Sequence, residues 1–141
     1  MKHAITKKFI TDTPKHTHIS TRKTFAKAPF LGPLTAYYIP EAGQLNMSFV
    51  HEAMPPMSEA PVMVHSKTKE LIYLICGKVT VLLNGKSISL KKNDCLVIPA
   101  GTTHQFKTKK EGMEAVSVLV PPIDPANPDA TIVCNLKTDK I

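Results

Sequence analysis

Short β-rich runs separated by turn residues fill the chain from Leu34 to Val120. Runs of β-branched and apolar residues of this length predict strands, and no window has the periodicity of a long amphipathic helix. Asn84-Gly85, between two of the runs, is the strongest local signal for a two-residue hairpin turn. Many short strands at this spacing favour an antiparallel sandwich or barrel. The expected strands are Leu34–Ile39, Leu45–Glu52, Glu70–Cys76, Lys78–Leu83, Lys86–Leu90, Asp94–Ile98, Thr103–Lys107 and Met113–Val120.

The 141 residues are enough for one domain with a hydrophobic core. We expect a basic, partly ordered N-terminal arm over residues 1–30, with an early strand near Lys7–Ile10, and a barrel over residues 31–141. Four prolines between Pro121 and Pro128 predict an extended C-terminal segment that leaves the barrel. A short closing strand is expected after it, at Thr131–Cys134.

The positive charge is concentrated in the arm. Residues 1–30 hold seven Lys or Arg and one acid, whereas the whole chain has a net charge of +7. A basic arm can attract nucleic acid. This arm has no recognisable nucleic-acid motif, so we expect a solvated segment and no nucleic-acid partner.

Cysteine usage and hydropathy favour a cytoplasmic location. The three cysteines are an odd number without Cys-x-x-Cys spacing, which fits a reducing compartment. Cys76 and Cys95 are expected to fill the core. No apolar run approaches transmembrane length, and none follows the N-terminal charges, so we expect neither a membrane span nor a secretory signal.

Two histidines and a carboxylate stand at fixed distances from turn residues. His65 precedes Glu70 by five positions, and His104 follows the turn Pro99-Ala100-Gly101. Alternation along Thr103–Lys107 places His104 on the apolar face with Phe106. Two imidazoles and one carboxylate form the ligand set of a divalent-metal site with open coordination positions.

These residues resemble the two motifs of cupins, Gly-x5-His-x-His-x3-4-Glu-x6-Gly and Gly-x5-Pro-x-Gly-x2-His-x3-Asn. The resemblance spans about residues 45–121 and implies a small single-domain cupin. Its fold would be all-β, the cupin double-stranded β-helix, a jelly-roll-like antiparallel barrel. It also implies one divalent metal ion (Fe, Mn, Ni or Zn) held by His65, Glu70 and His104. The matching positions are His65, Glu70 and Gly77 in the first motif, and Pro99, Gly101 and His104 in the second.

The sequence departs from the motifs at several positions. Met63 stands where the first histidine is usual, Asn93 replaces the leading Gly of the second motif, and Thr108 replaces its final Asn. Asn tolerates positive φ, so Asn93 still suits a tight turn. A thioether is a weak ligand for hard divalent ions, so we expect Met63 to pack against the site. His51 would supply a replacement imidazole only if its side chain points inward; a half-exposed position is the commoner case.

Two outcomes follow from the loss of the first histidine. One is a three-ligand site in a metal-dependent enzyme of dioxygenase, isomerase or lyase type, acting on a small molecule, with Tyr73 or Cys95 assisting if they face the lumen. The other is a non-catalytic cupin that binds a small molecule or metal for sensing or storage. The resemblance also implies a homodimer. The single arginine, Arg22 in the arm, argues against a carboxylate or phosphate gripped bidentately in the barrel.

Overall fold

The computed structural model describes residues 20–21, 23, 25–28, 31–127 and 129–133. The described part is almost entirely β-structure, and one 3₁₀ helix lies before the third strand. The arm residues 1–19, including the expected strand at Lys7–Ile10, lie outside the described residues. The elements are β1 (Ala26–Lys27), β2 (Thr35–Tyr38), η2 (Pro40–Leu45), β3 (Ser48–Met54), β4 (Met63–His65), β5 (Lys69–Leu83), β6 (Lys86–Lys91), β7 (Cys95–Ile98), β8 (His104–Lys107), β9 (Met113–Val120) and β10 (Ala130–Ile132).

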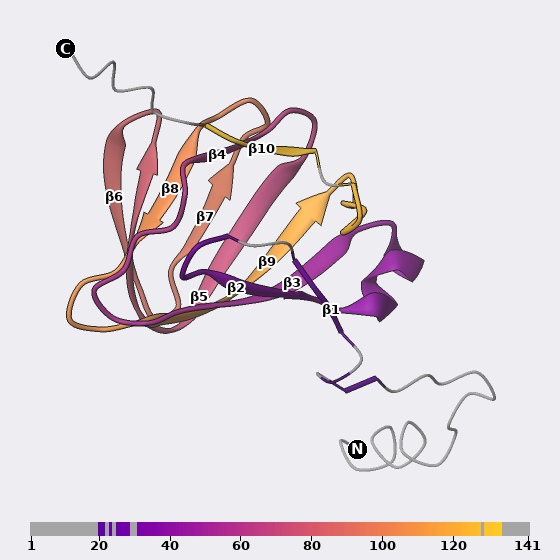
Figure 1. Cartoon of the computed structure of the whole chain (residues 1–141), viewed down its shortest axis with the longest axis horizontal. Helices are drawn as coiled ribbons and strands as arrows, with labels where there is room; N and C mark the ends of the chain where they lie inside the picture. The colour runs from indigo at the N-terminus through magenta and orange to yellow at the C-terminus, as the bar shows by residue number, and fades with distance from the viewer. Residues whose placement is uncertain (1–19, 22, 24, 29–30, 128, 134–141) are drawn as a thin grey trace, which may run out of the picture.

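All strand pairings are antiparallel, and they connect the strands in the order β1-β2-β3-β9-β5-β8-β4-β10, with β6 and β7 also on β5. The first part of β5 pairs with β9 and β7, and its last part pairs with β6 and β8. This curling of β5 places β6 and β8 on one side of the molecule and β9, β3 and β2 on the other (Figure 1). The all-β antiparallel barrel expected from the sequence is confirmed.

Strand β5 corrects the expectation of two strands divided at Gly77. It is one strand of 15 residues, and its register with β9 shifts between Leu74 and Cys76. Gly77 adopts φ +80°, and a Cβ there would collide with the carbonyl oxygen of Gly112. Glycine therefore lets β5 and the turn before β9 approach closely.

The register shift reverses which side chains of β5 face inward. Ile72 and Leu74 are buried before the shift, and Val79 and Val81 are buried after it. Cys76 is exposed as a result, so its expected place in the core is wrong. Cys95 is exposed too, because it pairs with Tyr73 on the outward face of β5.

The segment before β3 also differs from expectation. Residues Pro40–Leu45 form the 3₁₀ helix η2 and Asn46 ends it in the left-handed region, so the strand begins at Ser48 and not at Leu45. Pro40 at the first helical position favours this start. The expected turns are confirmed: Asn84 and Gly85 have φ of 47° and 81°, and Asn93 has φ of 74°.

The proline-rich segment packs against the barrel instead of leaving it as expected, because the amide of Ile123 donates to Oγ of Ser48 on β3 and Ile123 is buried. The expected closing strand is present: β10 pairs with β4 and begins one residue before Thr131, and Cys134 lies outside the described residues. The barrel interior is apolar over most of its length, with Ile72, Leu74, Val81 and Phe106 at 0–1 % exposure. No helix among the described residues is long and apolar enough to cross a membrane.

Candidate metal centre

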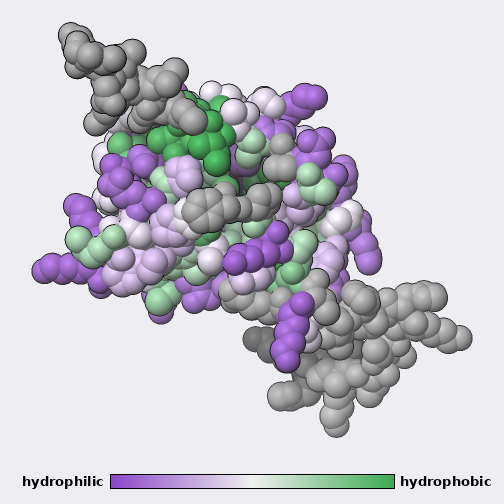
Figure 2. Space-filling model, viewed as in Figure 1, coloured by the Kyte–Doolittle hydropathy of each residue, from purple (hydrophilic) through white to green (hydrophobic). Residues whose placement is uncertain are grey.

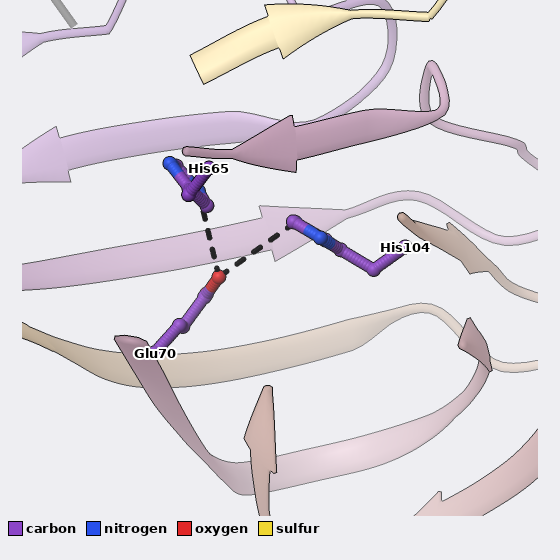
Figure 3. Close-up of side chains that lie close together, drawn as sticks. All are labelled: His65, Glu70 and His104. Atoms are coloured by element: carbon purple, nitrogen blue, oxygen red, sulfur yellow. Dashed lines mark ion pairs between the residues drawn. The ribbon is translucent and has the colours of Figure 1, made fainter. Parts of the chain in front are cut away.

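Three strands bring the two histidines and the carboxylate together inside the barrel. His65 ends β4, Glu70 is the second residue of β5, and His104 begins β8 (Figure 3). The Nε2 atoms of His65 and His104 each lie 3.8 Å from Oε2 of Glu70. All three side chains are buried, and one ligand atom from each falls within 4.8 Å of the others.

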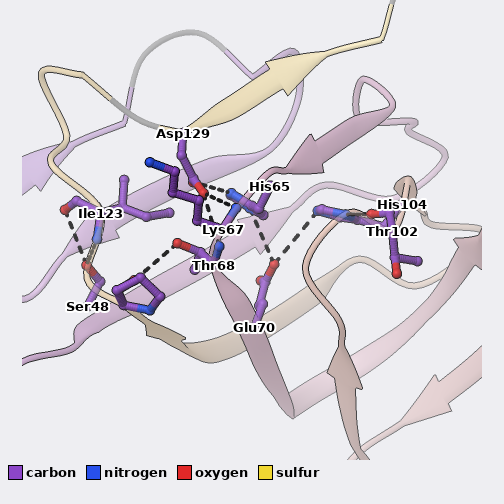
Figure 4. A network of polar contacts seen from close by, with 10 residues as sticks. Ser48, His65, Lys67, Thr68, Glu70, Thr102, His104, Ile123 and Asp129 are labelled. Carbon is purple, nitrogen blue, oxygen red and sulfur yellow. Dashed lines mark hydrogen bonds and ion pairs between the residues drawn. The ribbon is translucent and has the colours of Figure 1, made fainter.

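Local hydrogen bonds fix the loops that carry these residues. The amide N–H of Gly101 donates to the carbonyl of His65 at 2.7 Å, which ties the turn before β8 to the end of β4. The amides of Lys67 and Thr68 donate to Oδ2 of Asp129 at 2.9 and 3.1 Å. The loop between His65 and Glu70 therefore depends on a residue of the C-terminal segment (Figure 4).

The remaining ring nitrogens of the two histidines determine which tautomer each adopts. His65 Nδ1 donates to Oδ1 of Asp129 at 3.1 Å, and His104 Nδ1 donates to the carbonyl of Thr102 at 3.2 Å (Figure 4). A carboxylate and a carbonyl accept hydrogen bonds, so each Nδ1 carries the proton. In its neutral form each ring then directs the lone pair of Nε2 toward Glu70, the arrangement found in metal-ligating histidines.

Three acceptor atoms, Nε2 of His65, Nε2 of His104 and Oε2 of Glu70, lie close enough together to bind one cation. Among the described residues His104 Nε2 is buried and has no hydrogen-bond partner. Burial lowers the pKa of His104 below its ordinary value of 6.5, which favours the neutral imidazole that binds metals. Around a tetrahedral metal with bonds of about 2.1 Å, two ligand atoms lie about 3.4 Å apart. The distances of 3.8 Å from Oε2 of Glu70 to the two Nε2 atoms are only slightly longer, so small side-chain shifts would bring these atoms into binding positions.

Asp129 is a partner of the site that sequence reasoning missed. Partial burial opposes its ionisation, but hydrogen bonds from the Lys67 amide, the His65 ring and the Thr68 amide outweigh that effect and lower its pKa. An ionised Asp129 orients the His65 ring, as outer-shell carboxylates do at metal sites. Asp129 follows His65 by 64 residues, so no local sequence pattern indicates that the two side chains meet.

His51 does not replace the missing histidine. Residues of β3 alternate, and Val50 and Glu52 are buried while His51 lies on the other face. The His51 ring pairs with Glu114 at 2.7 Å on that outer face. Met63 is buried near the site, opposite His104 in the β4–β8 register, as expected for a packing residue.

Glu52 is an inward-facing carboxylate that the sequence analysis did not single out. It is 5 % exposed, and its Oε2 has no hydrogen-bond partner among the residues described. Burial first, and then the charge of Glu70, raise the pKa of Glu52 well above 4.5. The available signal was its spacing, since it stands two residues after the apolar Val50 and shares its face.

A cavity of about 180 Å³ is lined by the side chains of Glu52, Glu70 and His65. Most of its wall is apolar; the polar residues among those that line it are Tyr38, Glu52, His65 and Glu70. Burial, followed by the charges of Glu52, Glu70 and Asp129, raises the pKa of Tyr38 to about 12. The wall includes Ile132 of β10, which is 48 % exposed, and hydrophobic residues gather where Figure 1 places β4 and β10 (Figure 2).

Tyr73 and Cys95 do not line this cavity. They face each other across the β5–β7 pairing on the outer side of the sheet, and both are exposed. The condition for their assistance to catalysis, that they face the lumen, is therefore not met, because β5 alternates and Glu70 takes the inner face.

The sequence profile of the Cupin domain matches residues 50–121, about half of the chain. The chain belongs to the cupin family. The motif-based expectation is thereby confirmed, and the matched segment contains His65, Glu70 and His104. No curated protein matches the sequence significantly.

Solved cupin structures share the fold at low sequence identity. The predicted oxalate decarboxylase from Thermotoga maritima is 18 % identical with a TM-score of 0.60, over 72 % of this chain and 97 % of that one. The polyketide cyclase RemF from Streptomyces resistomycificus is 17 % identical with a TM-score of 0.61, over 73 % and 78 %. The nucleoside dehydratase Pac13 from Streptomyces is 14 % identical with a TM-score of 0.64, over 83 % and 91 %. These similarities establish the fold, which hosts several chemistries.

Proposed function

We propose that this cupin binds one divalent metal ion through His65, Glu70 and His104 and uses it in metal-dependent chemistry on a small molecule. The observation that carries the proposal is the convergence of two Nε2 lone pairs on a buried carboxylate. With both imidazoles neutral and no cation bound, these acceptors face one another with no hydrogen-bond donor among them. Buried polar groups in that position are unfavourable unless something pairs with them.

The rest of the cavity supports the same chemistry. A bound metal would polarise an oxygen of the small molecule or lower the pKa of bound water. Three protein ligands leave coordination positions for that oxygen. The apolar wall limits water, which strengthens electrostatic interactions at the site. Tyr38, with its pKa near 12, stays protonated at neutral pH and serves as a hydrogen-bond donor, not as a base.

The metal content of the purified, untagged protein tests the proposal. We expect about one equivalent in the wild type by elemental analysis, and its loss in His65→Ala and in His104→Ala. His51→Ala is the matched control, because it removes an imidazole from the outer face of β3. Absence of metal from the wild type, even after incubation with Fe, Mn, Ni or Zn, would contradict the proposal, as would equal losses in the control.

A second candidate is a non-catalytic cupin that binds a small molecule or metal for sensing or storage. The observation in its favour is Met63, a thioether in the cavity wall where cupins usually have a histidine. Turnover separates the two functions. A metal-loaded protein that retains a ligand unchanged supports the second, whereas conversion of that ligand, lost in His104→Ala, supports the first.

The homodimer and the cytoplasmic location remain predictions. The outer face of the sheet exposes Leu71, Tyr73, Val97 and Val120, which supports association through that face. Sedimentation of the wild type against Leu71→Lys would test it, because a charge at the centre of this face should produce monomers.

A further inference from the structure

A basic groove lies on the outer face of the sheet formed by β6, the second half of β5, and β8. Its volume of about 700 Å³ is within the roughly 300–1,000 Å³ of small-molecule sites. Asp94 and Glu111 are the acidic residues of its lining, against five lysines, which gives a net charge of +3. No residue lines both this groove and the cavity beside the candidate metal ligands, so the groove is a separate site beyond the proposed metal chemistry. The lysines are Lys78, Lys91, Lys107, Lys109 and Lys110.

The strand register places lysines of three neighbouring strands on one face. Val79 of β5 is buried, so its neighbours Lys78 and Thr80 face outward. Lys78 pairs directly with Lys91 of β6. On the other side of β5, Thr80 pairs with Lys107 of β8 (Figure 1). Neighbouring strands lie about 4.8 Å apart, so the Cα atoms of these three lysines are about 5–12 Å from one another.

Most of these positive charges are not neutralised within the described part of the protein. Lys107 pairs with Glu59 at 3.3 Å, whereas the other four lysines form no ion pair with a described residue. Asp94 accepts a hydrogen bond from the backbone amide of Lys91 at 2.9 Å, not from its ammonium group. Like charges directly opposite each other on antiparallel strands are destabilising. The opposed pair of Lys78 and Lys91 therefore favours an anion beside it.

The remaining polar side chains of the groove suit phosphate oxygens. Thr80 and Ser89 lie opposite each other on β5 and β6, and both line the groove. A hydroxyl donates to a phosphate oxygen, and a lysine ammonium binds phosphate as a point charge without the planar fork of arginine. The lining contains no aromatic side chain on which a nucleic-acid base would stack. These features favour a small phosphate compound over a nucleic-acid strand.

We propose that this groove binds small molecules that carry two or more linked phosphate groups. One phosphate group carries a charge of about −1.5 to −2, which is too little for four lysines without an ion pair. Linked phosphates extend over several lysines at once and bring more charge to the same groove. The groove is exposed to solvent, so its attraction for anions is screened by salt.

Titration of the full chain with inorganic phosphate, pyrophosphate and tripolyphosphate in metal-free buffer tests the inference. Calorimetry measures the dissociation constants, and NMR shifts of the Thr80 and Ser89 amides locate the site. We expect affinity to rise along this series, with tripolyphosphate binding at least about tenfold more tightly than phosphate and losing affinity as salt is added. Citrate, which carries carboxylates, should bind at least about tenfold more weakly than tripolyphosphate.

A double variant identifies the residues responsible. Lys78→Gln with Lys91→Gln removes the opposed pair and should weaken tripolyphosphate binding at least about tenfold. The fold should persist, because a like-charge contact is removed. Lys86→Gln with Lys92→Gln is the matched control: it removes the same charge at two exposed positions outside the lining. We expect this control to change the affinity by less than about threefold.

Tripolyphosphate that binds no more tightly than phosphate or citrate would overturn the inference. Equal losses in the two double variants would also overturn it, because they would assign the binding to net charge and not to the groove. A ten-nucleotide DNA strand that displaces tripolyphosphate at a lower concentration of phosphate groups would make nucleic acid the occupant instead. The comparison of probes in the wild type stands even if a variant does not fold.

Discussion

The inner face of strand β5 changes character along its length. At its start Glu70 is buried beside two imidazoles, whereas farther along Ile72, Leu74, Val79 and Val81 are buried among other hydrocarbons. The one buried carboxyl group of β5 lies where His65 and His104 converge on it. Substitutions at the start should therefore alter ligand binding, and substitutions farther along should alter stability.

The largest effect is expected where the two parts of β5 join. Gly77→Ala should lower the free energy of unfolding by at least about 3 kcal/mol, because it combines a left-handed φ with a collision against the carbonyl of Gly112. Gly85→Ala is the matched control: its φ is also near +80° but nothing lies near its Cβ position, so about 1–2 kcal/mol is expected. Urea unfolding measures both, and equal losses would show that the close approach is unimportant.

The apolar part of the inner face should respond to truncation. Leu74→Ala removes a side chain with 0 % exposure and should lower stability by about 2–5 kcal/mol. Leu45→Ala at the end of η2, where the side chain is 70 % exposed, should cost less than about 1 kcal/mol. If the chain's metal content stays at the wild-type level in Leu74→Ala while stability falls, the two parts of the strand are separable in function.

At the start of β5, next to the candidate metal ligands, the expected change is in the affinity for the metal. Asp129→Asn removes the charge that orients His65 and should weaken metal binding about 10–100-fold. It should also cost about 1–3 kcal/mol of stability, because Asn has one acceptor oxygen for the His65 ring and the amides of Lys67 and Thr68. Asp124→Asn, in the same C-terminal segment, is the control, because the Asp124 side chain accepts a hydrogen bond from the neighbouring Ala126 amide and lies outside the candidate ligand group. Competition with a chromogenic chelator measures the affinity. Identical affinities in the two variants would remove Asp129 from the site.

Tyr38 links the cavity to alkaline stability. Its pKa is raised from 10.0 to about 12 in the folded protein, so the unfolded chain loses this proton first as the pH rises. The stabilisation is complete below pH 10 and is lost toward pH 12, and partial exposure of the ring limits the expected fall to about 1 kcal/mol between pH 9 and pH 11. Tyr38→Phe should lack this part of the decline. A decline of the same size in Tyr38→Phe and wild type would assign it to other groups.

Local sequence signals predicted the features that depend on neighbouring residues. Asn84-Gly85 gave the hairpin turn, alternation placed His104 inward, and motif spacing selected the three residues that converge. The features that sequence reasoning missed depend on distant partners. Asp129 reaches His65 only because β10 returns to β4, and Glu52 becomes part of the cavity only through the register of β3 with β9.

The register shift in β5 is the clearest case of information missing from a local pattern. Unbroken alternation from Glu70 predicts Cys76 on the inner face, but one extra residue reverses the alternation after Leu74. The shift lies next to the close approach of Gly77 to Gly112, which is 35 positions away in the sequence. The hydropathy of the sequence does not indicate the register shift, because both faces of this stretch carry apolar residues.

The smallest expected effect tests that reversal directly. Cys76→Ser should change the free energy of unfolding by no more than about 0.5 kcal/mol, because an exposed thiol makes few contacts. If Cys76 faced the core, burying a hydroxyl there would cost more than about 1 kcal/mol. A thiol reagent added to the folded protein should label one fewer rapidly reacting cysteine in the variant than in the wild type. Equal labelling together with a large loss of stability would mean that alternation continues through Cys76, and that the inner face of β5 has a single register.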